Sequence, residues 1–168
     1  AILEAVGRKN SGEVGKIVVF GCLSQRYAHE LPELIPEVDA WYGAREFDPV
    51  VRELGVEPDP AKTARRYLTT PSHYAYLKIS EGCDRRCSYC AIPFIRGAHT
   101  SVPMEILVEE AEKLAQNGVR ELIIIAQDTT YYGLDLYRRR ALAELLQKLS
   151  EVEGIEWIRI HYSYPAAF

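Results

Sequence analysis

The chain has 168 residues, 48% of them hydrophobic and 26% charged, and a formal net charge of -4 at pH 7. No apolar run reaches the roughly 20 residues of a membrane-spanning helix, and the negative charge gives no general attraction to polyanions, so neither a membrane protein nor direct nucleic-acid binding is expected. Four cysteines without a secretory leader fit a reducing compartment, and we expect a cytoplasmic protein. Because the chain lacks an initiator methionine and starts inside a helical pattern, we also expect a fragment that lacks both ends.

Residues 1–55 alternate between short helical and extended patterns. An amphipathic helix is predicted at the start, where Ile2, Leu3 and Val6 share a face. Ser24 is predicted to cap a second helix, because a serine oxygen accepts hydrogen bonds from the free amides of a helix start. The other predicted elements are strands over 16–20 and 39–43 and helices over 25–31 and 47–54. A βαβα alternation of this kind implies an α/β unit with a parallel sheet.

Residues 56–72 contain three prolines among polar residues, with no steady period, and this predicts a linker. Residues 73–168 then follow the order strand, helix, strand, helix, strand. The predicted strands cover 74–79, 122–126 and 157–162. The predicted helices are 141–149 and a segment whose first helical residue is Pro103, with an apolar face of Ile106, Leu107, Ala111, Leu114 and Ala115. Right-handed crossovers make such strands parallel and bring their carboxyl ends to one edge of the sheet, where ligands bind. This order reads as the first half of a β/α barrel, and the residues expected at that edge are Cys83, Gln127, Asp128 and Ser163.

Three thiols follow the first strand of the second piece. They belong to Cys83, Cys87 and Cys90, with three and then two residues between them. One short loop of this kind can present three sulfur atoms to a single 4Fe–4S cluster. Three protein ligands leave one iron open to a small ligand that binds through nitrogen and oxygen, as S-adenosylmethionine does through its amino and carboxylate groups.

Neighbouring residues offer contacts for such a ligand, whose buried polar groups need partners. Tyr89 would flank the adenine, and Gln127 and Asp128, which follow the second strand, would meet the methionine end or the ribose. An ordinary polar turn is the other interpretation of Gln127 and Asp128.

A structural zinc loop completed by His99 or His73 is the alternative for the three thiols. Zinc sites usually draw paired ligands from two separated knuckles, and Cys87 with Cys90 forms the one pair of that kind. A disulfide framework is less consistent with a reducing compartment. Cys22, a lone small residue after a strand, is on its own more typical of a core residue than of a ligand.

Three longer stretches resemble the methylthiotransferase branch of the radical SAM superfamily. They are residues 21–27, 83–97 and 126–133, and the resemblance extends over nearly the whole chain. Within that branch, residues 126–133 and 161–165 are most similar to the members that methylthiolate an aspartate of a small-subunit ribosomal protein. The members that modify a tRNA adenosine are the second interpretation, and a non-catalytic, zinc-stabilised interaction module is a third.

The resemblance implies the remainder of an N-terminal βαβα methylthiotransferase domain over 1–55, a linker over 56–72 and the first half of a radical SAM β/α (TIM-like) barrel over 73–168. It also implies S-adenosylmethionine and a 4Fe–4S cluster on the three cysteines of the loop. In the intact protein it implies a second, auxiliary 4Fe–4S cluster, for which Cys22 matches the third ligand. The implied partner is the ribosomal protein substrate, whereas the sequence identifies neither the electron donor nor a catalytic residue.

One loop departs from the family pattern. Ala98, Thr100 and Val102 stand where basic residues are common, and Val102 replaces an arginine typical of the branch. This departure puts anion or substrate contacts at the loop in doubt, but not cluster binding.

Overall fold

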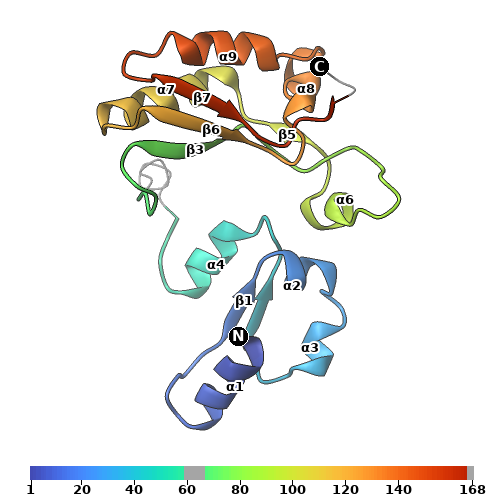
Figure 1. The fold of residues 1–168 in the computed structure, drawn as a ribbon. Coiled ribbons are helices and arrows are strands. Elements are labelled where there is room, and N and C mark those ends of the chain that lie inside the picture. Colours follow the sequence, from blue (N-terminus) through green and yellow to red (C-terminus); the bar gives the residue numbers. More distant parts are fainter. Residues whose placement is uncertain (59–66, 166–168) are drawn as a thin grey trace. The chain divides into compact units, whose positions relative to one another are not determined.

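The computed structural model describes residues 1–58 and 67–165, and these form two compact units (Figure 1). The first comprises the described residues of Ala1–Arg66 and also Phe94–Arg96, and the second comprises those of Tyr67–Pro93 and Gly97–Phe168. Residues 59–66 of the predicted linker lie outside the described residues. None of the helices in the described ranges has the length and apolar character that crossing a membrane requires.

The first unit is built around a pair of short parallel strands, which confirms the predicted parallel sheet. Val18 pairs with Ala40 and Phe20 with Tyr42. Its elements are α1 (Ile2–Asn10), β1 (Val18–Phe20), α2 (Cys22–Arg26), α3 (Leu31–Leu34), β2 (Ala40–Tyr42) and α4 (Phe47–Glu53). A small core of Val6, Ile17 and Val38 joins α1 to the segments that lead into the two strands.

The prediction that Ser24 caps a helix is wrong. Helix α2 already begins at Cys22, with Gly21 in the N-cap position. The Ser24 hydroxyl is buried and lies within hydrogen-bond distance of the Gly21 and Tyr42 carbonyls, so it joins α2 to the end of β2. Gly21 has φ +124°, a conformation that glycine adopts readily, and this explains why the helix can start there without a serine cap.

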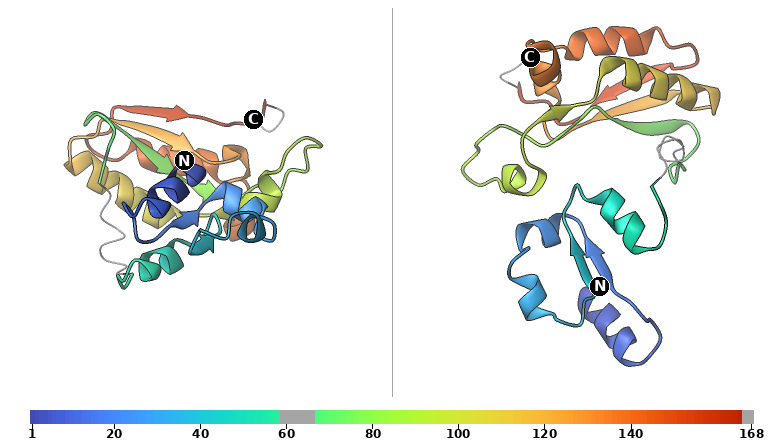
Figure 2. Two further views of the ribbon diagram at one scale, coloured as in Figure 1. Left: turned by 90° about the horizontal axis from the view of Figure 1, so that it is seen from below. Right: turned by 180° about the vertical axis from the view of Figure 1, so that it is seen from behind.

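The second unit contains a parallel sheet in the order β3-β6-β7, as the strand and helix order predicts. Figure 2 shows this sheet and its helices from two further sides. The elements that follow the first unit along the chain are β3 (Tyr74–Lys78), β4 (Ser80–Glu81), α6 (Ile92–Arg96), β5 (Thr100–Ser101), α7 (Met104–Gln116), β6 (Glu121–Ile125), η1 (Thr129–Tyr131), α8 (Leu134–Tyr137), α9 (Leu142–Ser150) and β7 (Trp157–Ile160). The mixed α/β architecture with parallel sheets confirms the predicted fold class.

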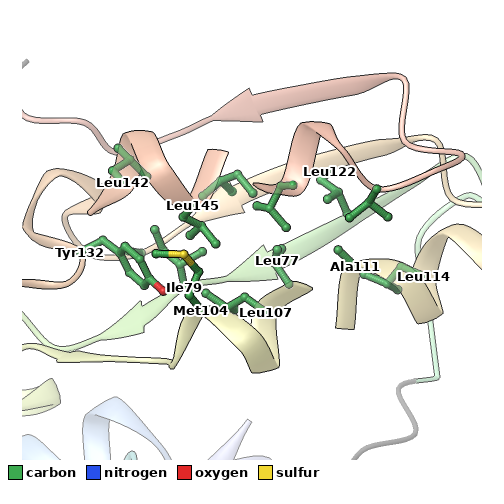
Figure 3. Packing of buried hydrophobic residues seen from close by; sticks show 14 of the residues in the cluster. Leu77, Ile79, Met104, Leu107, Ala111, Leu114, Leu122, Tyr132, Leu142 and Leu145 are labelled. Atoms are coloured by element: carbon green, nitrogen blue, oxygen red, sulfur yellow. The ribbon is translucent and has the colours of Figure 1, made fainter. Parts of the chain in front are cut away.

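Helices α7 and α9 pack on one face of this sheet (Figure 3). Leu77 of β3 pairs in register with Ile124 of β6, and both side chains are fully buried in the same cluster as Leu107 of α7 and Leu145 of α9. The buried stripe of α7 consists of Met104, Leu107, Ala111 and Leu114, at the spacing of three and four residues that one helix face requires.

Two details of that helix differ from the sequence prediction. Ile106 is 53% exposed, because it lies off the stripe that Met104 and Leu107 begin. Pro103 is the N-cap rather than the first helical residue. The packing nevertheless fixes the sheet, and the sheet brings the carboxyl ends of β6 and β7 to the same edge as the segment after β3.

Candidate functional site

The three clustered cysteines lie in residues 82–99, which connect β4 to β5 and are called the cysteine loop below. The two ends of the loop are held together by antiparallel pairing of Ser80 with Ser101 and of Glu81 with Thr100. The Cys83 amide also donates a hydrogen bond of 3.1 Å to the Gly97 carbonyl. The sequence analysis missed both strands of this pair.

Gly82 makes the close approach of the two loop ends possible. Its φ is +76°, in the region that favours glycine, and a Cβ at this position would lie 2.1 Å from the Ala98 carbonyl oxygen and 2.5 Å from that of Gly97. Because both obstacles are backbone atoms, no other residue fits without moving the loop.

The cysteine loop and the segments that follow β6 and β7 line an open cavity of about 270 Å³. All three cysteines of the loop line it, and they are free and partly buried. Burial raises the pKa of the Cys83 thiol, while a hydrogen bond from the Arg85 backbone acts in the opposite direction. The same cavity is lined by Tyr89, Gln127 and Asp128, so the structure brings together six of the seven predicted site residues.

Gln127 leaves an acceptor without a partner at this cavity. Its Oε1 atom is buried and has no hydrogen-bond partner within residues 1–58 and 67–165. Buried polar atoms are rarely left unpaired, and an unpaired one at a cavity indicates a missing donor. Tyr89, in contrast, is 91% exposed on the loop, where its ring is free to cover a ligand.

Asp128 is almost fully buried, and both of its oxygen atoms have partners within the protein. Oδ1 accepts hydrogen bonds from the Thr130 amide at 2.9 Å and the Thr130 hydroxyl at 2.6 Å, and Oδ2 accepts one from Arg85 Nε. Burial alone would raise the pKa of Asp128, but the hydrogen bonds from Thr130 and Arg85 outweigh it and hold the pKa below its usual value. Asp128 thus caps η1 and pairs with the cysteine loop at the same time.

Arg85 is the residue of this site that the sequence analysis did not identify. Its guanidinium carbon lies 3.6 Å from the ring centroid of Tyr164 and 4.7 Å from that of Tyr131. The adjacent Arg86 is exposed, so the sequence pattern of two arginines did not distinguish a buried from a solvated side chain. Asp128, Tyr131 and Tyr164 follow the strands and together form a binding site for one cation. Their presence was the signal in the sequence that pointed to a partner such as Arg85.

Two expectations about neighbouring residues can be compared with the structure. Ser163 lies at the predicted edge, with its hydroxyl 2.9 Å from that of Thr129. Val102 packs against the hydrophobic core, and its carbonyl accepts a hydrogen bond from Tyr132. Val102 is therefore used for packing.

Cys22 and His99 are not among the residues that line this cavity. Cys22 is the exposed first residue of α2, in the first unit. His99 is buried, and its Nε2 atom lies 3.0 Å from the Ser101 hydroxyl. In the part of the chain that the structure describes, no three His, Cys, Asp or Glu side chains are grouped so that they could hold a single metal ion, and this applies to the three cysteines of the loop as well as to any set that includes His99.

The structure thus places a loop of three thiols at the carboxyl edge of a parallel α/β sheet. This arrangement is typical of enzymes that use S-adenosylmethionine for radical chemistry. The family model described as the radical SAM superfamily matches residues 77–167, more than half of the chain. The chain belongs to the radical SAM superfamily, which confirms the resemblance found in its motifs.

Individual relatives extend this result over the whole chain. The chain is 56% identical to the ribosomal protein uS12 methylthiotransferase RimO of Flavobacterium johnsoniae, 57% identical to that of Christiangramia forsetii and 55% identical to that of Porphyromonas gingivalis. In each case the comparison covers 99% of this chain. The chain spans only 37% to 38% of the length of these relatives.

The superfamily implies a 4Fe–4S cluster and S-adenosylmethionine, and the residues at the cavity fit both. Three cysteines from one short loop line the cavity, and thiolates are the ligands that iron–sulfur clusters take. The unpaired oxygen of Gln127 suits a hydroxyl or amino donor of the bound nucleoside or methionine.

Proposed function

We propose that this chain supplies the radical-generating site of a methylthiotransferase that modifies an aspartate of ribosomal protein uS12. The observation that carries the proposal is the cavity lined by Cys83, Cys87, Cys90 and Gln127 at the carboxyl edge of the sheet. The substrate is inferred from the relatives, which are named as methylthiotransferases of uS12 and align with 99% of the chain.

The roles of the residues follow from their chemistry. The three cysteines would hold the cluster as thiolates, and because burial raises the pKa of Cys83, iron must displace its proton when it binds. When bound, the cluster supplies the electron that cleaves S-adenosylmethionine to a deoxyadenosyl radical.

The other lining residues would bind and enclose the cofactor. Gln127 Oε1 would accept a hydrogen bond from it, and the exposed ring of Tyr89 would cover the adenine. Residues 162–165, which line the same cavity, would help to exclude water from the radical.

We extend the proposal to the first unit through Cys22. An exposed thiol is accessible to a second cluster, and we propose that Cys22 is one of three ligands of an auxiliary 4Fe–4S cluster. We further propose that residues 1–55 are part of a methylthiotransferase domain, that 56–72 are a linker and that 73–168 are part of the radical SAM barrel.

A substrate assay tests the assignment. The intact protein that contains this chain is reconstituted anaerobically and incubated with S-adenosylmethionine, a reductant, a sulfur source and either uS12 or tRNA, and the products are analysed by mass spectrometry. We expect a methylthio group on a uS12 aspartate, and none in the tRNA. Modification of adenosine without modification of uS12 would assign the chain to the tRNA enzymes.

A further inference from the structure

We propose that Arg85 is a positioning residue, which fixes the cysteine loop against the ends of β6 and β7 and so aims the three thiols into one cavity. The expected effect of Arg85 on cofactor binding rests on the proposed function. The attachment of the loop through Arg85 does not, because it is a property of the protein without any metal.

The Arg85 side chain connects the cysteine loop to two other segments of the second unit. It pairs with Asp128, in the segment after β6, and its guanidinium lies against Tyr164, in the segment after β7. Its Nη2 atom is also 3.4 Å from the Thr130 hydroxyl. Arg85 lies between Cys83 and Cys87, so a constraint on its side chain limits the positions that both thiols can take.

The environment makes this attachment specific for arginine paired with a carboxylate. The Asp128 side chain is 5% exposed and that of Arg85 is 21% exposed, so each charge depends on the other for compensation. A planar guanidinium can stack on two rings and donate in its own plane at the same time, which a lysine ammonium cannot do. Removal of Arg85 leaves the buried Asp128 carboxylate without a counter-ion, and removal of Asp128 leaves the partly buried guanidinium without one.

The same contacts distinguish two possible roles of Asp128. Three hydrogen bonds from Thr130 and Arg85 occupy most of the roughly four acceptor sites of the Asp128 carboxylate. The proposal therefore assigns Asp128 to holding Arg85 rather than to contact with the cofactor.

The chain offers matched controls for a test. Arg86 is next to Arg85 in the same loop but exposed, so Arg86→Ala removes the same charge without the attachment. Asp128→Asn keeps an acceptor for the Thr130 amide, and asparagine caps as well as aspartate does, but it removes the charge that Arg85 needs.

The first measurement is amide hydrogen exchange of the metal-free protein over residues 83–90. We expect about tenfold faster exchange in Arg85→Ala and in Asp128→Asn, the factor that corresponds to about 1.4 kcal/mol of lost protection, and no change in Arg86→Ala. If Arg85→Ala does not fold, the comparison of Asp128→Asn with Arg86→Ala decides the question. Equal exchange in Asp128→Asn and the wild type would overturn the proposal, because Asp128 would then be only a cap.

The second measurement is titration of S-adenosylmethionine into reconstituted protein, with iron quantified in each sample. We expect Arg85→Ala to bind the cofactor about tenfold more weakly at equal iron content, and Asp128→Ala to add no further loss in the Arg85→Ala background. An independent loss from Asp128→Ala in that background would show direct contact and overturn the role assigned to Asp128. A wild type that binds neither iron nor cofactor would contradict the proposed function, while the exchange experiment would still test the attachment.

Discussion

At the scale of single residues, Gly82 is a position where any side chain would clash with the backbone of the cysteine loop. Replacement by alanine places a methyl group against two carbonyl oxygens and also forces a left-handed conformation on a residue with a side chain. The left-handed conformation alone costs about 1 to 2 kcal/mol, and the clash adds to it. We expect Gly82→Ala to lower the free energy of unfolding by more than this amount and to reduce iron binding.

Gly118→Ala is the matched control for Gly82→Ala. Gly118 also has positive φ, +89°, but nothing lies within 4 Å of the added Cβ. The difference between the two variants in a denaturant titration therefore measures the clash. Equal destabilisation would mean that the loop moves freely at Gly82, contrary to the geometry described above.

Tyr132 provides a second test at this scale. Its ring is fully buried, its hydroxyl donates a hydrogen bond of 2.9 Å to the Val102 carbonyl, and burial raises its pKa, so it remains a donor at neutral pH. Tyr132→Phe leaves that carbonyl without this donor and should cost about 1 to 3 kcal/mol in denaturant unfolding. Tyr67→Phe, on a side chain that is 93% exposed, should cost almost nothing. A Tyr132→Phe variant as stable as the wild type would show that the hydrogen bond contributes nothing net.

Asp135 predicts a dependence on pH. Burial would raise its pKa, but hydrogen bonds from the Ser101 hydroxyl at 2.6 Å and amide at 2.8 Å outweigh it and lower the pKa below the ordinary value of 3.8. A carboxyl with a lowered pKa stabilises the folded state above its unfolded pKa, and this contribution is lost as pH falls through the folded pKa. The wild type should lose more thermal stability than Asp135→Asn between pH 7 and about pH 3. Parallel melting curves for the two proteins would contradict this prediction.

At the scale of secondary-structure elements, helix α7 shows how one buried stripe fixes the sheet. Leu107 is fully buried, and the adjacent Ile106 is 53% exposed. Leu107→Ala should therefore cost about 2 to 5 kcal/mol in free energy of unfolding. Ile106→Ala should cost less than about 1 kcal/mol, since exposed positions tolerate truncation. Denaturant unfolding of the two variants checks the orientation of the helix, and similar losses would contradict it.

The long elements of the second unit could be predicted because their apolar spacing is set by burial on a sheet or a helix face. Strand β6 is an example, with Leu122 and Ile124 facing the helices. The short strands β4 and β5 could not be predicted, because two residues carry no period. The Arg85–Asp128 pair was missed for a different reason, since its members are 43 residues apart and only the fold brings them together.

At the scale of the whole molecule, the chain consists of two compact units of unequal size. The first has a small core of Val6, Ile17 and Val38, whereas the larger core of the second supports the cavity. Three parallel strands covered by helices on one face are consistent with the beginning of a β/α barrel, which remains a prediction. The strand order predicted that Cys83, Gln127, Asp128 and Ser163 lie at one edge of the sheet, and the structure places all four at one cavity. Only the fold shows that Tyr162, Tyr164 and Pro165 line the same cavity.

The central claim is that Cys83, Cys87 and Cys90 hold a 4Fe–4S cluster that cleaves S-adenosylmethionine. The most direct measurement is iron content and reductive cleavage of S-adenosylmethionine in anaerobically reconstituted wild type, in the variant with all three cysteines changed to alanine, and in Cys22→Ala as a control outside the cavity. The triple variant should contain about four fewer iron atoms than the wild type and produce no deoxyadenosine, whereas Cys22→Ala should still cleave the cofactor. A triple variant that retains its iron, its visible absorbance and its cleavage activity would contradict the claim.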